Sequence, residues 1–171
     1  VVVKPHQGGS GLGVSYASTA DELRSAMVAC FAYDERALIE RYIPGTELAV
    51  SVVDTGEGPL ALPPVEVVTD GQYDFDARYN PGRSEYFVPA RLNDSVIEMV
   101  KSTAVTVHST LGLGNLSRTD LILDEEGTPW FIDVNVIPGM TETSLLPIAA
   151  KAEGGLEGLY DALVRNPLVH P

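Results

Sequence analysis

The feature that most constrains the fold is a predicted β-hairpin with acidic side chains on one face. Residues 116–123 and 130–135 are typical of two strands, joined through the turn-forming segment 125–128. Because side chains alternate between the two faces of a strand, a register set by this loop assigns every residue to a face. It pairs Arg118 with Asn135, Asp120 with Asp133, and Leu123 with Trp130.

The two facing carboxylates predict a metal site. Directly opposed side chains have Cβ atoms about 5 Å apart, and like charges at that distance are destabilising unless a cation lies between them. Asp120, Asp133 and the amide oxygen of Asn135 form an all-oxygen set of the kind Mg²⁺ uses. The alternative is a pair of solvated acids on an outer face. Leu121 and Leu123 on the other face of the strand argue against it, because they predict that the hairpin is covered.

Strands and helices of mixed order along the chain predict an α+β fold with a largely antiparallel sheet. The other expected strands are residues 1–4, 37–42, 48–54 and 60–68, the last two forming a hairpin. Helices are expected from Thr19 or Asp21, from Asn93 or Asp94, from Ser144, and over residues 156–164. The first should bury Leu23, Met27, Cys30 and Phe31, and the long one Ile97, Val100, Ala104, Val107 and Leu111. His108 is expected on the surface of the long helix.

A glycine-rich loop, Gly8 to Gly13, follows the first strand. The backbone N–H groups of such a loop can wrap a phosphate, and the hydroxyl of Ser10 adds a donor. Lys4, just before the loop, can deliver a positive charge to the same phosphates. The segment matches neither the Walker pattern nor the dinucleotide fingerprint, so an ordinary turn beside a solvated lysine remains the alternative.

The segment 38–43 is a strand that leads into a linker, and its backbone groups can hydrogen-bond to adenine. Glu40 can accept from the exocyclic amine, and Glu47 from ribose hydroxyls. The alternative is an edge strand with solvated acids. Further along, residues 70–91 are polar and rich in Tyr, Gly and Pro without a period, and loops of that length are usually lids or binding loops.

Composition excludes several classes of function. The net charge of −13 argues against a nucleic-acid partner, because phosphate binding needs clustered Lys and Arg. No stretch approaches the roughly 20 apolar residues that cross a bilayer, so no membrane partner is expected. The single cysteine, Cys30, fits a reducing cytoplasmic setting. Because Val1-Val2-Val3 begins a strand at once, we expect the chain to be the C-terminal part of a longer protein that is truncated at its N-terminus.

Taken together, these segments resemble the ATP-grasp fold, and specifically the D-alanine–D-alanine ligases. The segments that carry the resemblance are Val3-Lys4-Pro5 with Gly9-Ser10, Leu38-Ile39-Glu40, residues 73–79, Arg118-Thr119-Asp120, and residues 135–141 running into Ser144-Leu145. The resemblance implies that residues 1–42 are the remainder of the central subdomain. It implies that residues 43–171 are the C-terminal subdomain, with a lid or ω-loop at about 69–91.

Carried over residue by residue, the resemblance assigns roles at the site. ATP would be held by Lys4 on phosphate, Glu40, Tyr42 and Ile43 around adenine, Glu47 on ribose, and Arg78 near the γ-phosphate. Two Mg²⁺ ions, with Mn²⁺ as an alternative, would be held by Asp120, Asp133 and Asn135. Catalysis would use Arg118 and the Gly139 N–H on the oxyanion, with Ser10 and Tyr79 closing the lid. The second D-alanine would be positioned by Ser144 and Leu145.

The implied activity is ATP-dependent ligation of two D-alanines through an acyl phosphate, for peptidoglycan precursors in the bacterial cytoplasm. The full-length protein would be a candidate homodimer, and the isolated 171-residue chain is expected to be inactive. The alternatives are another carboxylate–amine ligase, a D-alanyl-D-lactate ligase, or a non-enzymatic ATP-grasp domain.

The chain is expected to depart from the family pattern in three ways. The family has glutamate at Asp133 and a second serine at Gly11. The N-terminal domain that would bind the first D-alanine is absent, as is the upstream part of the central domain with its own ATP-binding lysine. In addition, Arg78 stands where the family has a lysine. The shorter side chain of Asp133 leaves open how strongly the metal site binds.

Overall fold

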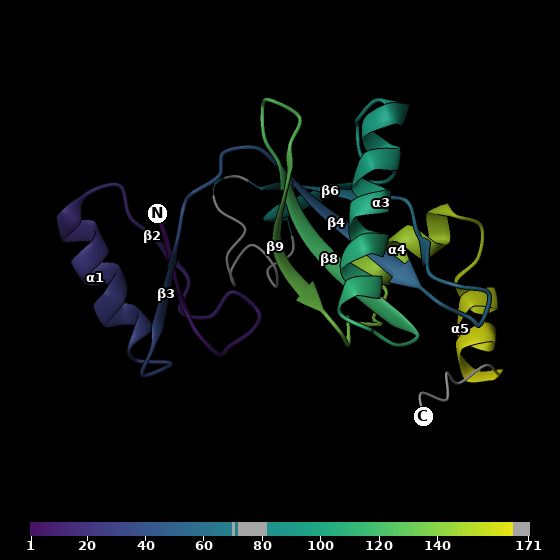
Figure 1. Cartoon of the computed structure of the whole chain (residues 1–171), viewed down its shortest axis with the longest axis horizontal. Coiled ribbons are helices and arrows are strands. Elements are labelled where there is room, and N and C mark those ends of the chain that lie inside the picture. Colours follow the sequence, from purple (N-terminus) through teal and green to yellow (C-terminus); the bar gives the residue numbers. More distant parts are fainter. Residues whose placement is uncertain (70, 72–81, 166–171) are drawn as a thin grey trace. The chain divides into compact units, whose positions relative to one another are not determined.

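The computed structural model describes residues 1–69, 71 and 82–165. The chain divides into two units, one formed by Val1–Ile43 and Thr69–Glu85, the other by Pro44–Val68 and Tyr86–Pro171. Among the described residues, one sheet has three strands and the other six. Figure 1 labels many of these strands and the helices. The strand pairs whose registers are defined are all antiparallel, which confirms the predicted α+β class.

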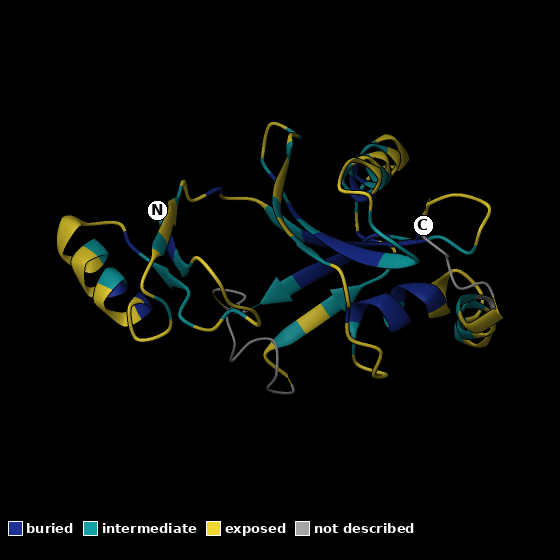
Figure 2. Ribbon diagram, turned by 60° about the horizontal axis from the view of Figure 1, so that its bottom comes forward, coloured by how far each residue is buried: buried dark blue, intermediate teal, exposed yellow. Residues whose placement is uncertain are grey.

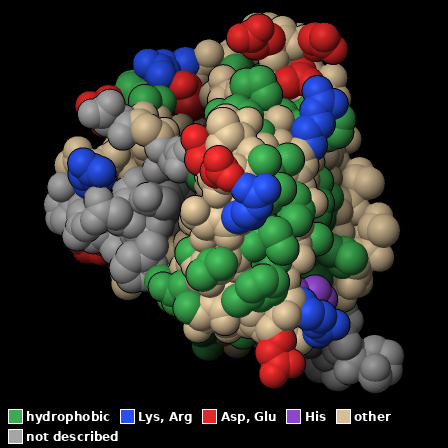
Figure 3. Space-filling model, turned by 90° about the vertical axis from the view of Figure 1, so that its left-hand side faces the viewer, with side chains coloured by type: hydrophobic (Ala, Val, Ile, Leu, Met, Phe, Trp, Pro, Cys, Tyr) green, Lys and Arg blue, Asp and Glu red, His purple; other side chains and the backbone are tan. Residues whose placement is uncertain are grey.

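The first unit packs one helix on the three-stranded sheet. The strands are β1 (Val2–Pro5), β2 (Ser15–Tyr16) and β3 (Ala37–Glu40), in the order β2-β1-β3. The helix α1 (Ala20–Cys30) buries Ala26 and Cys30 against Val3. Phe31, expected in this core, is instead 49% exposed. Val28 and Tyr33 are also exposed. Figure 3 shows hydrophobic side chains gathered near the centre of one face, among charged and other side chains.

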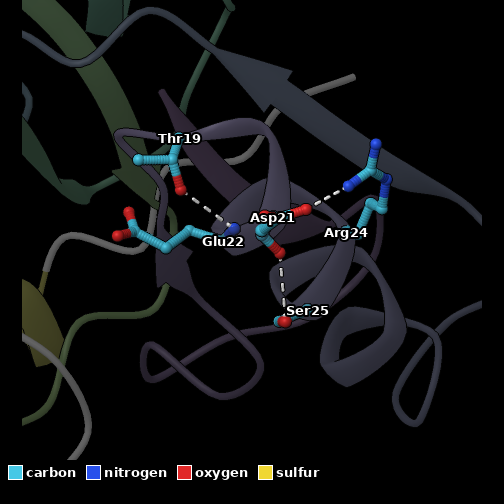
Figure 4. Close-up of polar contacts among 5 residues, drawn as sticks. All are labelled: Thr19, Asp21, Glu22, Arg24 and Ser25. Atoms are coloured by element: carbon cyan, nitrogen blue, oxygen red, sulfur yellow. Dashed lines mark hydrogen bonds and ion pairs between the residues drawn. The ribbon is translucent and has the colours of Figure 1, made fainter.

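The start of α1 is capped by the side chain of Thr19, one of the two N-cap residues that the sequence predicts (Figure 4). The backbone N–H of Glu22 donates to Thr19 Oγ1 at 3.2 Å, and the Ser18 N–H donates to the Glu22 carboxylate at 2.7 Å. Arg24 forms an ion pair with Asp21 one turn earlier. The contact from Glu22 satisfies one of the N–H groups that the first helical turn leaves without an intrahelical partner.

The second unit is built on a sheet of order β7-β6-β4-β8-β9, with β5 also pairing with β4. The strands are β4 (Thr46–Val53), β5 (Leu60–Ala61), β6 (Val65–Thr69), β7 (Ser84–Phe87), β8 (Leu116–Leu123) and β9 (Pro129–Asn135). The single strand predicted over residues 60–68 is divided in two. Pro63 and Pro64 lie at the division, and proline has no N–H to donate to a ladder.

Helices lie on opposite faces of this sheet (Figure 2). One face packs against α3 (Asp94–Thr110), which is capped by Asn93 as predicted. Their shared core consists mainly of Leu48, Val50, Val52, Leu121 and Leu123 from the sheet and Val100 and Ala104 from α3. The other face packs against α4 (Leu145–Ala152), and α5 (Leu156–Arg165) packs against α4. No helix in the described part of the chain is long and apolar enough to cross a membrane.

Two glycines allow close approaches that this architecture needs. A Cβ at Gly45 would collide with the carbonyl oxygen of Leu123, where the chain enters β4 beside the end of β8. A Cβ at Gly139 would lie 2.6 Å from Ser144 Oγ, in the turn between β9 and α4. Gly45 is therefore required by the backbone packing, and Gly139 by a side chain of the candidate site.

The prediction that His108 lies on the surface is wrong. His108 is 3% exposed and continues the buried stripe of Val100 and Ala104 at a spacing of four residues. Its Nδ1 lies 2.8 Å from Ser117 Oγ, which satisfies the ring in the interior. Burial lowers the pKa of His108 below 6.5, although Asp54 and a hydrogen bond to the backbone of Gly114 act in the opposite direction.

We expect the free energy of unfolding to fall as the pH drops from 7 towards 5, because of His108. The folded state holds the ring neutral, whereas the unfolded chain takes up a proton below about pH 6.5, so acid favours unfolding. The slope for one proton is at most about 1.4 kcal/mol per pH unit. Guanidinium unfolding at pH 5, 6 and 7 measures it. His108→Gln should flatten the curve, and an unchanged slope in this variant would contradict the assignment.

Candidate active site

The acidic hairpin brings the predicted metal ligands together. In the register of β8 and β9, Asp120 pairs with Asp133, and Arg118 pairs with Asn135, as predicted. Beyond Asp120 the register shifts by one, so Leu123 pairs with Pro129 rather than with Trp130. A bulge re-aims side chains locally, and bulges are frequent beside active sites. Here it places Ile132 between the paired residues Phe131 and Asp133.

Arg118 forms a bidentate ion pair with Asp120, a contact that the sequence analysis did not anticipate. Nε donates to Oδ1 at 2.7 Å and Nη2 to Oδ2 at 2.9 Å, and the arginine side chain is only 10% exposed. The guanidinium therefore neutralises part of the charge that Asp120 presents to Asp133. Each carboxylate oxygen of Asp120 keeps lone-pair capacity beyond this contact, so the ion pair does not exhaust its ability to bind a cation.

Asn135 has its amide oriented by the chain that follows it. The backbone N–H of Ile137 donates to Asn135 Oδ1 at 3.1 Å, which closes a turn at the end of β9. Among the described residues, no group of three or more His, Cys, Asp or Glu side chains is placed to hold a metal. The hairpin instead offers two carboxylates and one amide oxygen, a hard donor set that suits Mg²⁺ when water and phosphate complete its coordination.

The turn after β9 presents Gly139 and Ser144 together. Ser144 is the N-cap residue of α4, but its side chain makes no capping hydrogen bond. Its Oγ accepts from the Thr141 N–H at 3.2 Å and lies 2.8 Å from Thr141 Oγ1. Leu145, predicted to contact substrate, has a buried side chain at the start of α4. The sequence analysis missed Thr141, although two hydroxyl residues three positions apart before a helix are a recognisable signal.

In the part of the chain that the structure describes, two buried hydroxyls of this unit have no hydrogen-bond partner. They belong to Ser51, which pairs with Arg118 across β4 and β8, and to Thr119. Cross-strand partners lie on the same face of a sheet, so Ser51 lies on the Arg118 side and Thr119 on the opposite side.

In the first unit, Lys4 and Glu40 lie on neighbouring strands and form an ion pair, with Nζ and Oε2 2.6 Å apart. From the sequence, Lys4 was expected to bind phosphate and Glu40 to bind adenine. Their direct contact was not predicted. Tyr42 is 50% exposed and packs edge-on against Tyr16, with ring centroids 5.8 Å apart, while Ile43 is buried. Glu47 lies in β4 of the second unit, paired with Val67 and Ile122.

Three residues of the glycine loop have a left-handed backbone conformation. Ser10, Gly11 and Gly13 have positive φ values of 59°, 76° and 72°. Gln7, at the start of the loop, donates its N–H to Asp34 Oδ2 at 2.7 Å. This hydrogen bond, together with one from the Arg36 N–H, holds the pKa of Asp34 below its ordinary value. Left-handed residues turn successive N–H groups toward a common side, as in anion-binding loops.

The end of the predicted lid is anchored in the second unit. Arg91 donates from Nε and its backbone N–H to Glu66 Oε2, both at 3.0 Å, and from Nη2 to Oε1 at 2.7 Å. These bonds lower the pKa of Glu66, which is buried. The Arg91 guanidinium also lies 3.6 Å from the ring centre of Phe87. Two predicted site residues, Arg78 and Tyr79, lie outside the described residues.

Comparison with known proteins identifies the family. The model described as D-ala D-ala ligase C-terminus matches residues 1–166. The chain belongs to this family. A D-alanine–D-alanine ligase of Halalkalibacterium halodurans is 42% identical over 156 residues, which are 90% of this chain and 51% of the relative. The chain spans about half the length of the curated relatives that it matches.

Solved structures confirm the ATP-grasp fold for this family member. The D-alanine–D-alanine ligase of Bacillus anthracis matches with a TM-score of 0.80 at 31% identity, over 96% of this chain and 53% of that one. The VanG D-Ala:D-Ser ligase of Enterococcus faecalis matches with a TM-score of 0.83 at 26% identity, over 96% and 48% of the two chains. Both solved proteins are ligases named for D-alanine.

Proposed function

We propose that the complete protein is an ATP-dependent ligase that joins two D-alanines for peptidoglycan precursors in the cytoplasm. The observation that carries the proposal is the arrangement in the second unit. Asp120 and Asp133 face each other, Arg118 lies in the same hairpin, and the following turn presents Gly139 beside Ser144. Phosphate chemistry and acyl transfer need charge neutralisation and oriented donors, and this arrangement supplies both.

Asp120, Asp133 and Asn135 would hold Mg²⁺, in the place where the protein meets the ATP phosphates. The metal, when bound, neutralises the charge that develops on the transferred phosphoryl group. We propose that two Mg²⁺ ions bind at this site and that Mn²⁺ can replace them. The shorter carboxylate of Asp133 reaches less far than a glutamate, so water would complete more of the coordination.

The reaction would proceed in two steps. The carboxylate of the first D-alanine attacks the γ-phosphorus, which forms an acyl phosphate and releases ADP. The amine of the second D-alanine then attacks the acyl carbon, and phosphate leaves as the amide forms. Arg118 and the Gly139 N–H would stabilise the oxyanion of the tetrahedral intermediate, while Ser144 and Leu145 position the second D-alanine.

We propose nucleotide contacts for residues of both units. Lys4 would bind phosphate, Glu40, Tyr42 and Ile43 would frame adenine, Glu47 would bind ribose, and Arg78 would approach the γ-phosphate. Ser10 and Tyr79 would close the lid, which excludes water from the acyl phosphate. We also propose that the complete protein forms a homodimer and binds no nucleic acid.

The solved D-Ala:D-Ser ligase at a TM-score of 0.83 favours D-serine as a second candidate acceptor. A competition assay tests both, together with the D-lactate alternative. The complete protein would be incubated with ATP, Mg²⁺, D-alanine and each acceptor near neutral pH, and the products separated by mass. We expect D-alanyl-D-alanine to predominate. Predominant ester or D-alanyl-D-serine would overturn the acceptor but leave the ligase assignment, whereas ATP hydrolysis without any ligated product would overturn the ligase.

A further inference from the structure

The hydroxyl of Ser144 is held by Thr141 rather than by its own helix. A serine at an N-cap position ordinarily accepts a hydrogen bond from the second or third N–H of the helix. Ser144 makes no such bond, although its backbone starts α4. Its Oγ instead accepts from the Thr141 N–H at 3.2 Å and lies 2.8 Å from Thr141 Oγ1. The hydroxyl is thus turned away from the helix and fixed in the turn.

We propose that Thr141 is a positioning residue, which sets the Ser144 hydroxyl to donate to the carboxylate of the acceptor amino acid. The proposal rests on the proposed function, which places the acceptor at Ser144. Thr141 itself would not contact the acceptor. It would act by orienting the proton of the Ser144 hydroxyl.

The hydrogen-bond donors and acceptors of Ser144 support this role of Thr141. A serine hydroxyl has one proton and two lone pairs. The Thr141 N–H takes one lone pair, and the Thr141 hydroxyl, when it donates across the 2.8 Å contact, takes the other. The proton of Ser144 is then the remaining hydrogen-bonding group, and it can only donate outward. A carboxylate only accepts, so this polarity matches the acceptor and the reverse polarity does not.

The same turn holds a third hydroxyl, that of Thr143. Thr143 Oγ1 lies 3.4 Å from Thr141 Oγ1, and either hydroxyl could donate across this long contact. Gly139 provides the space, because a Cβ there would lie 2.6 Å from Ser144 Oγ. Thr141 is therefore the residue whose backbone and side chain both contact the Ser144 hydroxyl.

The test measures the KM for the acceptor in the complete protein. Thr141→Val keeps the side-chain shape and the backbone N–H but removes the hydroxyl. We expect it to raise the acceptor KM about threefold to tenfold, the range of one hydrogen bond, with the KM for ATP unchanged. Thr141→Ser restores the hydroxyl and should restore the KM. Thr143→Val is the matched control and should change the acceptor KM less than about twofold, because its hydroxyl does not contact Ser144.

A double-mutant cycle distinguishes positioning from general damage to the turn. In a Ser144→Ala background, Thr141→Val should have no further effect on the acceptor KM, since its target is gone. An unchanged KM in Thr141→Val alone, or an equal rise in both backgrounds, overturns the proposal. If the enzyme uses D-serine or D-lactate instead of D-alanine, the proposed function fails separately. The cycle is then run with that acceptor, which carries the same carboxylate.

Discussion

Asp120→Asn in the complete protein is expected to lower the ligation rate by roughly 10³-fold, because it removes a carboxylate from the proposed metal site. Asparagine has the same shape and keeps an oxygen that can accept from Arg118, so the fold should persist. The loss of one charged hydrogen bond with Arg118 should cost about 1.5–3 kcal/mol of stability. Product formation would be followed against Mg²⁺ concentration, with thermal unfolding measured in parallel.

The matched control is Asp124→Asn, the same chemical change in the loop of the same hairpin. Asp124 accepts from Trp130 Nε1 at 2.7 Å and from the Thr128 N–H at 2.8 Å, and these hydrogen bonds hold its pKa below the ordinary value. Its replacement should therefore reduce stability somewhat and leave turnover within about twofold, because the loop carries no proposed ligand. Near wild-type turnover of Asp120→Asn at low Mg²⁺ would remove Asp120 from the metal site.

The sequence was sufficient to predict the facing of Asp120 and Asp133, but not the whole hairpin. Side chains alternate between the two faces of a strand, and the loop sets the register of the two strands. Together these determine the pairing near the site. Toward the loop, Trp130, Phe131 and Ile132 are all apolar, so their pattern does not say which residue is the extra one of a bulge. The register shift between Asp120 and Leu121 is consequently visible only in the structure.

The buried residues of helix α3 could be predicted from the sequence where they are hydrophobic. Val100 and Ala104 were assigned to the core correctly, whereas His108 was not, because a polar ring can be buried when a partner satisfies it. The partner, Ser117, is on β8, and pairing across elements cannot be read from spacing within the helix. Leu111, expected in the same core, is 54% exposed at the C-cap of α3, where the helix ends.

The residues of the candidate site could be predicted from the sequence, whereas the contacts between them could not. The sequence analysis assigned Arg118 and Asp120 to different partners, and it did the same for Lys4 and Glu40. In the structure each pair is joined by an ion pair. Opposite charges on adjacent strands, or two positions apart on one strand, lie within reach of each other when no ligand separates them. A ligand that binds either pair therefore competes with a protein contact, and sequence spacing gives no measure of that competition.

Gly139→Ala is expected to lower kcat/KM for the acceptor by roughly 10²-fold, the cost of displacing a positioning group by about 1 Å. Gly139 does not need a left-handed backbone; what it needs is space, because a Cβ would lie 2.6 Å from Ser144 Oγ and 3.4 Å from Ser144 Cβ. The hydroxyl must rotate or the turn must shift, and either movement disturbs both the acceptor contact and the Gly139 N–H. Initial rates over a range of acceptor concentrations measure the loss.

The stability of the Gly139→Ala protein should change little, since Gly139 is exposed in a turn and the collision involves one hydroxyl. Gly155→Ala is the control: a Cβ there meets nothing within 4 Å, so its kinetics should match the wild type. Changing Ser144 to Ala at the same time removes the colliding atom. If the collision with Ser144 Oγ is the cause, Gly139→Ala should add little to the loss already produced by Ser144→Ala. A full 10²-fold loss in both backgrounds would instead assign the effect to the Gly139 N–H and the oxyanion.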